Sequence, residues 1–311
     1  MPRLTVLLSY YNLEAYLDEA IASIRTQTHR DFVLVLLDDG STDGSPAIAA
    51  RHAAADPRVR IMRSETNLGI SANLNRGLAA VATELVALMD GDDIALPERL
   101  AGQLAYLDAH PEVVAVGCFP LMVTESLRPI GTPVIFHERH EDIERELLAG
   151  NGWAFLPPTA ILRLAAVRVC GAFRTDLATS MDLDFFLRLG EIGRLANLPK
   201  VYQQYRLRTR SVTHAHDVGR SRRHNDVLIA AYQRRGLDAA PPVVTAAAIH
   251  ATPTDLHMRW SWWALAAGHV DTARHEAWLA VRGAPWSWRC WKTLLCALRG
   301  RAAVAVAPVR D

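Results

Sequence analysis

Short apolar runs alternate with helical segments along residues 4–89, and this alternation limits what the chain can fold into. The runs at 4–8 and 32–37 are continuously apolar, as buried strands are, and segment 13–28 between them carries apolar residues at helical spacing. The pattern then repeats, with further expected helices at 47–55 and 71–82 and further expected strands at 59–63 and 85–89. It predicts an α/β fold, a mainly parallel sheet with helices on both faces.

Polar clusters directly follow three of these expected strands. They are Ser9–Asn12, Asp38–Asp43 and Asp90–Asp93. Because ligands of parallel sheets bind at the carboxyl ends of the strands, we expect the three loops to converge on one edge.

The remainder of the chain changes character near residue 220. Before it we expect a helix at 99–110, a strand at 113–116, an irregular region to about 156, a helix or strand at 161–169, a helix at 182–192 and a strand at 201–206. After it the pattern is wholly helical, at 228–235, 253–267, 270–282 and 287–298. We therefore predict two domains, 1–220 and a helical extension, 221–311.

Charge is uneven along the chain although the net charge is only +1. Residues 1–100 hold 9 Lys and Arg against 14 Asp and Glu, whereas residues 200–311 hold 17 against 7. An acidic region that binds an anionic ligand favours a metal ion between the two, and a basic tail favours contact with phosphate or anionic lipid. We expect no nucleic-acid partner.

Cysteine spacing and hydropathy indicate the cellular compartment of the protein. The four cysteines form no C-x-x-C pair, the N-terminus lacks the pattern of a signal peptide, and no window approaches about 18 uninterrupted apolar residues. We expect a cytoplasmic protein that does not span a membrane.

The acidic loop Asp90-Gly91-Asp92-Asp93 is the strongest chemical signal. Carboxylates two residues apart on a loop can converge on one hard cation, and Mg²⁺ or Mn²⁺ binds such oxygens together with substrate phosphates. The alternative is a solvated acidic turn. In the loop at 38–43, a carboxylate could accept a nucleobase N–H while Gly40 permits a tight turn, or the loop could be only a turn and helix cap.

Taken together, these motifs resemble family 2 glycosyltransferases of the GT-A fold. Ser9–Asn12 stands where that family has P-x-Y-N, Asp38–Asp43 matches D-D-G-S-x-D, Asn67–Gly69 matches N-x-G, and Asp90–Asp93 matches D-x-D-D. The resemblance implies a Rossmann-like sheet and a donor site for a nucleotide diphosphate sugar.

The resemblance also implies roles for single residues. Ser9 and Tyr11 would contact the nucleotide, with Tyr11 stacking on the base, and Asp39 would bond the base N–H. Asp90 would lie near the ribose and sugar, and Asp92, with Asp90, would hold Mn²⁺ or Mg²⁺.

A later segment is similar to the E-D-x-D-x-x-x-R-L motif that carries the family's general base. Here 182–189 matches from the second position, so that Asp182 would be the base, while Met181 replaces the usual Glu. A structural alternative has Asp182 capping the helix. Further on, Tyr205–Arg208 departs from the family's Y-R-x-H, and Arg206 and Arg208 either neutralise the departing diphosphate or form a solvated basic loop.

The implied activity is inverting transfer of a sugar, by default from a UDP-hexose, to an acceptor hydroxyl of a saccharide or lipid-linked saccharide, as in bacterial surface-polysaccharide assembly. The alternatives are a catalytically impaired nucleotide-sugar-binding protein of the same fold, a sugar-phosphate nucleotidylyltransferase and a glycoside hydrolase. The first strand of a nucleotidylyltransferase would be followed by a Gly-rich loop, and a hydrolase would need neither Asp39 nor a metal.

Seven of the eight tryptophans lie in the tail, among arginines and a lysine. Tryptophan beside cations is typical of a helix that lies on a membrane surface, which predicts peripheral contact with the inner face of the membrane. In the alternative, the tail is a packed helical hairpin with a core stripe of Ala273, Ala277, Val281 and, on the last helix, Leu294, Leu295 and Leu298.

Overall fold

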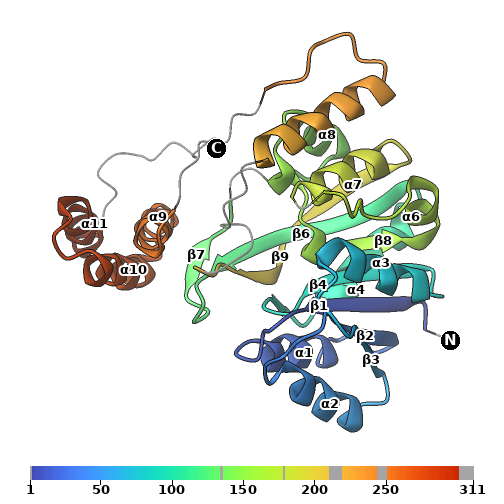
Figure 1. Cartoon of the computed structure of the whole chain (residues 1–311), viewed down its shortest axis with the longest axis horizontal. Coiled ribbons are helices and arrows are strands. Elements are labelled where there is room, and N and C mark those ends of the chain that lie inside the picture. Colours follow the sequence, from blue (N-terminus) through green and yellow to red (C-terminus); the bar gives the residue numbers. More distant parts are fainter. Residues whose placement is uncertain (1, 134–135, 178, 210–218, 244–250, 301–311) are drawn as a thin grey trace. The chain divides into compact units, whose positions relative to one another are not determined.

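The computed structural model describes residues 2–133, 136–177, 179–209, 219–243 and 251–300. The chain forms two compact units (Figure 1). The first comprises residues 1–119, 135–203 and 219–245, and the second comprises 120–134, 204–218 and 246–311. This division is not linear in sequence, and the expected domains 1–220 and 221–311 stay a prediction.

Four parallel strands form one half of the sheet in the first unit. They are β1 (Leu4–Tyr10), β2 (Phe32–Asp38), β3 (Val59–Arg63) and β4 (Leu85–Asp90), in the spatial order β3-β2-β1-β4. The connecting helices are α1 (Leu17–Arg25), α2 (Ser45–Ala55) and α3 (Ile70–Ala80). All seven residues of β1 are buried, as expected for a parallel strand covered on both faces.

The other half of the sheet contains antiparallel pairs. It continues from β4 through β8 (Ile161–Arg163), β6 (Val113–Val123), β9 (Arg194–Arg206) and β5 (Ile94–Ala95), and the short β7 (Pro129–Gly131) pairs with β6. The pairs β4–β8, β8–β6 and β6–β7 are all antiparallel. The parallel half therefore ends at β4, beside the acidic loop.

Two hydrophobic cores lie on opposite faces of this sheet. Alternate residues of β1 contribute to them, Leu7 to one core and Val6 and Leu8 to the other, which follows from the two-residue period of a strand. The remaining helices of this unit are α4 (Arg99–Ala109), α5 (His140–Leu148), α6 (Leu164–Cys170), α7 (Met181–Gly190) and α8 (Arg220–Arg234). Helices cover both faces, which confirms the expectation.

Helices α9 (Pro253–Ala266), α10 (Val270–Gly283) and α11 (Trp288–Arg299) form the helical part of the second unit. Small side chains, Ala264, Ala273, Ala277 and Ala297, are fully buried and let these helices approach closely. A capping box between Thr252 and Asp255 begins α9.

The structure corrects one expected feature of the helical part. On α10, Ala273, Ala277 and Val281 are buried as expected, but Leu295 and Leu298 of α11 are 55% and 54% exposed. The buried face of α11 is instead formed by Cys290, Thr293 and Ala297. Among the helices in the described part of the chain, none is both long and apolar enough to cross a bilayer.

Candidate functional site

The three polar loops meet at the carboxyl edge of the parallel strands, as the sequence predicts. Ser9 of β1 pairs in register with Asp90 of β4, and Tyr10 pairs with Asp38 of β2. Beyond the ends of the strands, the N–H of Gly91 donates to Ser9 O at 2.9 Å and the N–H of Asp39 donates to Tyr10 O at 3.0 Å. Neighbouring strands lie about 4.8 Å apart, so the loops are adjacent.

Asp39 joins its loop to the loop at Asn67–Gly69. One carboxylate oxygen accepts the N–H of Leu68 at 2.9 Å and the other accepts the N–H of Gly69 at 3.0 Å. Asp39 is 4% exposed, and each of its oxygens keeps a second acceptor position. The sequence matched both motifs to the family but did not reveal that one holds the other.

Gly40 allows these two loops to touch. Its φ is +78°, and a Cβ atom there would lie 2.6 Å from the carbonyl carbon of Thr66 and 2.9 Å from the nitrogen of Asn67. Both obstacles are backbone atoms that cannot rotate away. The expected tight turn at Gly40 is therefore present, and it also provides the contact surface for residues 66–67.

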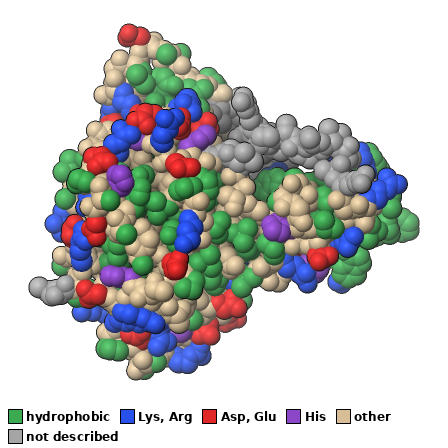
Figure 2. Space-filling model, turned by 180° about the vertical axis from the view of Figure 1, so that it is seen from behind, with side chains coloured by type: hydrophobic (Ala, Val, Ile, Leu, Met, Phe, Trp, Pro, Cys, Tyr) green, Lys and Arg blue, Asp and Glu red, His purple; other side chains and the backbone are tan. Residues whose placement is uncertain are grey.

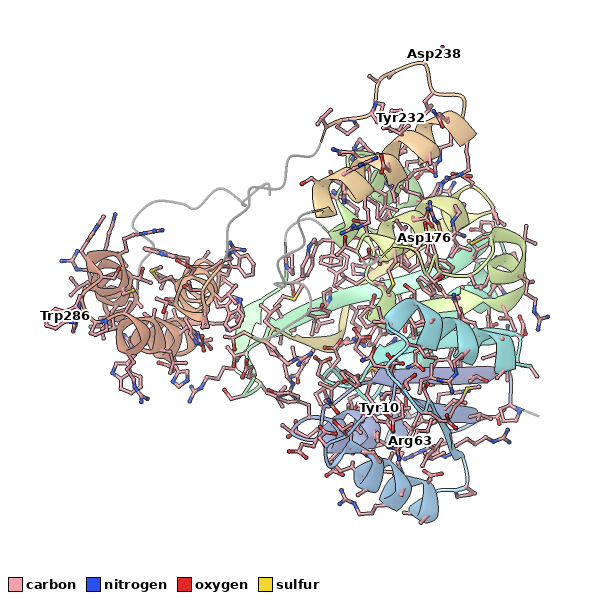
Figure 3. The ribbon with its side chains drawn as sticks, viewed as in Figure 1. Tyr10, Arg63, Asp176, Tyr232, Asp238 and Trp286 are labelled. Atoms are coloured by element: carbon pink, nitrogen blue, oxygen red, sulfur yellow. The ribbon has the colours of Figure 1, made fainter. Side chains whose placement is uncertain are left out.

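Asp38, which precedes this carboxylate, has a structural environment. One of its oxygens accepts the N–H of Ser41 at 2.9 Å, and the other lies 3.4 Å from Arg63 Nε. Burial, and then the charge of Asp38, raise the pKa of Tyr10 above its ordinary value. Tyr10 and Arg63 are labelled in Figure 3. Tyr11, the next residue, is 43% exposed, so its ring is accessible to a ligand.

The three carboxylates of the acidic loop differ in their exposure to solvent. Asp90 and Asp92 are partly exposed, whereas Asp93 is buried and accepts a 2.7 Å hydrogen bond from Gln203 Nε2 of β9. Gly91 fits between them because a Cβ there would lie 2.7 Å from Tyr10 Cβ and 3.2 Å from Ser9 O.

A buried cation lies behind this loop. Arg99, the first residue of α4, has no exposed surface and donates to Leu88 O at 2.8 Å and to Gln103 Oε1 at 3.2 Å. Burial lowers its pKa, while the neighbouring charges of Cys118, Asp93 and Asp90 act in the opposite direction. The guanidinium thus places a buried positive charge close to the acidic loop.

The donor set of this loop suits a hard divalent cation. Asp93 is buried and accepts from Gln203, whereas Asp90 and Asp92 are partly exposed. Among the residues that the structure describes, no three His, Cys, Asp or Glu side chains are grouped to hold a metal. Mg²⁺ and Mn²⁺ sites commonly take only one or two carboxylates and complete the shell with substrate phosphates, so a carboxylate pair fits.

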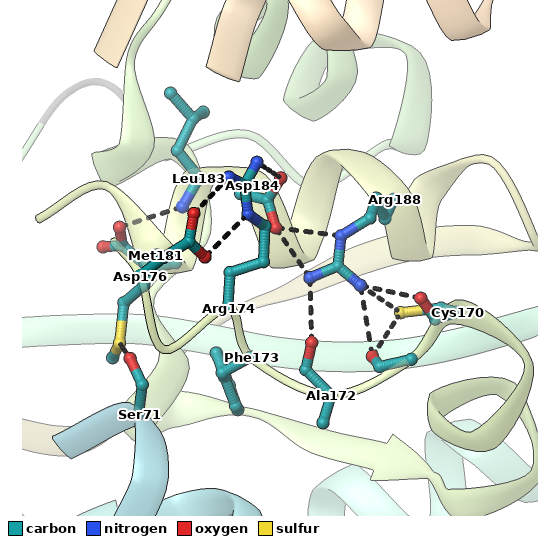
Figure 4. A network of polar contacts seen from close by, with 12 residues as sticks. Ser71, Cys170, Ala172, Phe173, Arg174, Asp176, Met181, Leu183, Asp184 and Arg188 are labelled. Carbon is teal, nitrogen blue, oxygen red and sulfur yellow. Dashed lines mark hydrogen bonds and ion pairs between the residues drawn. The ribbon is translucent and has the colours of Figure 1, made fainter. Parts of the chain in front are cut away.

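Helix α3 connects the strand edge with the helix that carries Asp182. Asn73 Nδ2 donates to Ser9 Oγ at 3.2 Å and to Leu37 O at 3.0 Å, and Asn73 is fully buried. Two residues earlier, Ser71 Oγ lies 2.6 Å from the sulfur of Met181 (Figure 4). The side chain that replaces the family's usual Glu is therefore in contact with α3.

Asp182 lies in the first turn of α7, which begins at Met181 after Ser180 in the left-handed region with φ 61°. Its Oδ1 accepts the N–H of Leu183 at 2.9 Å. A Cβ atom on Gly152 would stand 4.0 Å from its Oδ2, which is an ordinary van der Waals distance. Asp182 is partly exposed and is not the N-cap residue.

The second carboxylate of the same motif is structural. Asp184 is buried and accepts two hydrogen bonds from Arg188, at 2.9 Å and 2.7 Å. Arg188 also donates to the carbonyls of Cys170 at 2.7 Å and Ala172 at 3.0 Å (Figure 4). This pair holds the loop before α7, a role that the motif alone does not reveal.

Arg206 and Arg208 belong to the second compact unit. Arg206 is buried and donates to the carbonyl of Glu125, and the Glu125 carboxylate accepts the N–H of Thr209 at 2.8 Å. Arg208 is partly exposed. Within their own unit, these contacts fix the end of β9 against the turn after β6.

The fold is of the GT-A type that glycosyltransferases adopt. Among solved structures, the chain is similar to S. aureus TarS 1–349 in complex with UDP-GlcNAc, with a TM-score of 0.60 and 18% identity over 98% of this chain and 93% of that one. It is also similar to the mannosyltransferase PcManGT from Pyrobaculum calidifontis in complex with GDP-Man and Mn²⁺, with a TM-score of 0.55 and 23% identity over 96% and 85%.

Sequence comparison identifies the family within that class. Residues 5–164 match the family model of glycosyl transferase family 2, and the chain belongs to this family. It is 33% identical over 218 residues to the amylovoran biosynthesis glycosyltransferase AmsE of Erwinia amylovora, covering 65% of this chain and 75% of AmsE. The chain is therefore a glycosyltransferase.

Proposed function

We propose that the protein transfers a sugar from a nucleotide diphosphate sugar to a hydroxyl of a saccharide or lipid-linked saccharide, with inversion at the anomeric carbon. The observation that carries the proposal is the register of Ser9, Tyr10, Asp38 and Asp90, which brings three motifs of the family to one strand edge. The acceptor class follows from the likeness to AmsE, whose name assigns it to amylovoran biosynthesis.

The nucleotide is assigned to the loops after β1 and β2. Tyr11 is exposed enough for its ring to stack on a base, and Ser9 lies at the end of β1 beside it. The carboxylate of Asp39 accepts two backbone N–H groups, and these hydrogen bonds restrict the rotation of its side chain. In our proposal it accepts the base N–H through a remaining lone pair. A UDP-hexose is our default donor, in line with the UDP-GlcNAc bound to TarS.

The diphosphate is assigned to the acidic loop. Asp92 and Asp90 would hold Mn²⁺ or Mg²⁺, which when bound supplies positive charge to the phosphate oxygens. The Mn²⁺ in the PcManGT complex supports this choice of ion. The cationic role that the sequence predicts for Arg206 and Arg208 stays a prediction, because both residues belong to the second unit.

Asp182 is proposed as the general base. As the acceptor oxygen forms its bond to the anomeric carbon, Asp182 takes the hydroxyl proton, and the bond from that carbon to the nucleotide diphosphate breaks with its electron pair on the diphosphate oxygen. No covalent nucleophile is required for inversion.

Release of the nucleotide tests this proposal. Purified protein with Mn²⁺ and a panel of UDP-, GDP- and dTDP-sugars should release nucleotide diphosphate from one of them, faster when saccharide acceptors are added. Binding of a nucleotide sugar in a thermal-shift assay without any release would instead favour the catalytically impaired binding protein. A protein whose stability responds to no nucleotide sugar would contradict both.

A further inference from the structure

Helix α11 carries two faces of different kinds. Cys290, Thr293 and Ala297 are buried against the other helices of the second unit. Trp288, Trp291, Leu295 and Leu298 recur at intervals of three and four residues and are 69%, 48%, 55% and 54% exposed. At 100° per residue this second set forms one narrow stripe, so α11 presents a continuous apolar row away from its packed face.

Two further tryptophans of the same unit are exposed. Trp286, in the turn that precedes α11, is 98% exposed, and Figure 3 shows its side chain pointing outward from the helices. Trp278 of α10 is 48% exposed. Single exposed apolar residues are ordinary on a protein surface, but four large exposed residues in one row with a fully exposed indole beside them indicate an interaction surface.

Cations outnumber anions around these rings. Between Trp278 and Gly300 the sequence contains Arg282, Arg289, Lys292 and Arg299 and no Asp or Glu. All four are exposed. Arg282 lies 4.7 Å from the centroid of the Trp278 ring, and Lys292 lies 5.7 Å from that of Trp288. On the face of the larger unit that Figure 2 shows, acidic and basic side chains are interspersed.

We propose that this surface, which comprises Trp278, Trp286 and the exposed row of α11, docks on an anionic lipid bilayer. Indole rings favour the headgroup region because they combine an apolar body with a polar N–H. Lys and Arg close to the surface add attraction to anionic headgroups. Charge complementarity favours lipid over a second copy of the chain, because two copies that meet through this surface would face each other's cations, and residues 278–300 supply no carboxylate to pair with them.

The geometry limits how deep the docking goes. The indole N–H of Trp291 donates to Pro285 O at 2.8 Å, which fixes that ring across the turn, while Arg274 donates to Ala297 O and Leu298 O at the end of α11. The helix is therefore held by its own unit and would lie along the interface, as amphipathic helices do. The inference rests on the proposed function in one respect only, because a lipid-linked acceptor gives the docking its purpose.

Co-sedimentation of the full-length protein with vesicles tests the proposal. Vesicles of phosphatidylcholine with one third phosphatidylglycerol should pellet the protein at low salt, and pure phosphatidylcholine vesicles should pellet much less. Trp286→Ala with Trp288→Ala should weaken binding about tenfold or more, because it removes two exposed rings that have no packing role in the core. This double variant leaves Trp291 and its contact with Pro285 intact.

Charge reversal tests the role of the cations, and the same reversal elsewhere on the protein is the matched control. Arg289→Glu with Lys292→Glu should remove the preference for phosphatidylglycerol, since each cation near such a surface contributes roughly fivefold. Glu at the second position of α11 also suits the helix N-terminus, so folding should be retained. Arg60→Glu with Arg222→Glu makes the same change in net charge on β3 and α8 and should bind like the unaltered protein.

Four outcomes would overturn the proposal. One is an intact protein that stays in the supernatant with anionic vesicles. Another is an equal loss of binding in both charge-reversal pairs. A third is a dimer in gel filtration that the Trp286→Ala, Trp288→Ala variant converts to a monomer, which would assign the surface to a second copy. Removal of residues 301–311, which lie outside the described residues, should leave binding unchanged, and loss of binding would transfer the contact to them.

The vesicle assay contains neither metal nor sugar nucleotide, so its result is independent of catalysis. A protein that binds anionic vesicles but releases no nucleotide from any donor would contradict the proposed function and leave the docking surface in place. A protein that releases nucleotide but ignores the vesicles would do the reverse.

Discussion

The carboxylate of Asp39 accepts the N–H of Gly69 at 3.0 Å and so joins two loops that lie 30 residues apart in the chain. The other oxygen accepts the N–H of Leu68, so one side chain orients the whole turn that begins α3. The family motifs D-D-G-S-x-D and N-x-G are therefore one structural device. Any change that separates the two loops should disturb the proposed nucleotide site before it disturbs the sheet.

Gly40→Ala should disturb that junction. A methyl group at Gly40 would lie 2.6 Å from Thr66 C, and the residue would keep a positive φ that alanine adopts at a cost. We expect a loss of about 2–3 kcal/mol in the free energy of unfolding and a marked loss of donor affinity. Urea denaturation and calorimetric titration with the nucleotide diphosphate would measure the two effects.

Gly236→Ala is the matched control for this change. Gly236 also has a positive φ, +60°, but nothing lies within 4 Å of its Cβ position. The strain alone should cost about 1 kcal/mol and leave donor affinity unchanged. Equal effects of the two substitutions on donor affinity would mean that the contact of Gly40 with residues 66–67 has no bearing on the site.

Asp92→Asn should abolish transfer and leave the fold intact, because it removes a carboxylate from a partly exposed loop and no core volume. Nucleotide release from the best donor at saturating Mn²⁺ measures the loss. Asp31→Asn, at an exposed position before β2 and so at the opposite end of the parallel strands, should behave as the unaltered enzyme. Retention of more than a few per cent of activity by the Asp92 variant would count against the metal assignment.

The strands and helices were predictable where hydrophobic spacing is the main signal. The strand expected at 59–63 is β3, Val59–Arg63, without a change of boundary. Residues 161–169, for which the sequence left helix and strand open, contain both, β8 and then α6. Helix α5 was missed in a region expected to be irregular, because its nine residues bury only Ile143 and Leu147 and the rest is mostly charged.

Partners that lie far apart in the sequence were not predictable. Gln203 binds Asp93 across 110 residues, and Asn73 binds Ser9 across 64. No local spacing marks either pair, because each forms only when α3 or β9 packs beside the strand edge. Leu295 and Leu298 show the converse limit, since an apolar stripe in a sequence does not reveal whether it meets a core or an interaction surface.

The Asp184–Arg188 pair should be necessary for stability rather than for chemistry. The Asp184 side chain is 2% exposed and that of Arg188 16%, so Asp184→Asn would leave a largely buried guanidinium without its anion. We expect a loss of about 3 kcal/mol in unfolding free energy, measured by urea denaturation. Asp226→Asn removes a carboxylate from an exposed pair with Arg222 at the same spacing and should cost less than about 0.5 kcal/mol. If both variants lost the same small amount of unfolding free energy, burial of the Asp184–Arg188 pair would not contribute to stability.

Asp182→Asn should separate catalysis from donor binding. The substitution keeps the size of the side chain and an oxygen that can accept the N–H of Leu183, so α7 should still begin at Met181. It removes the proton acceptor, so turnover should fall about 10²-fold or more while the dissociation constant of the donor stays within a factor of about two.

Asp176→Asn is the control, because Asp176 is an exposed carboxylate on the loop before α7 that pairs with Arg174. Steady-state nucleotide release and calorimetric titration with the donor give the two quantities. Donor binding that weakens as much as turnover would remove Asp182 from the acceptor side of the site and leave the enzyme's base to be sought elsewhere.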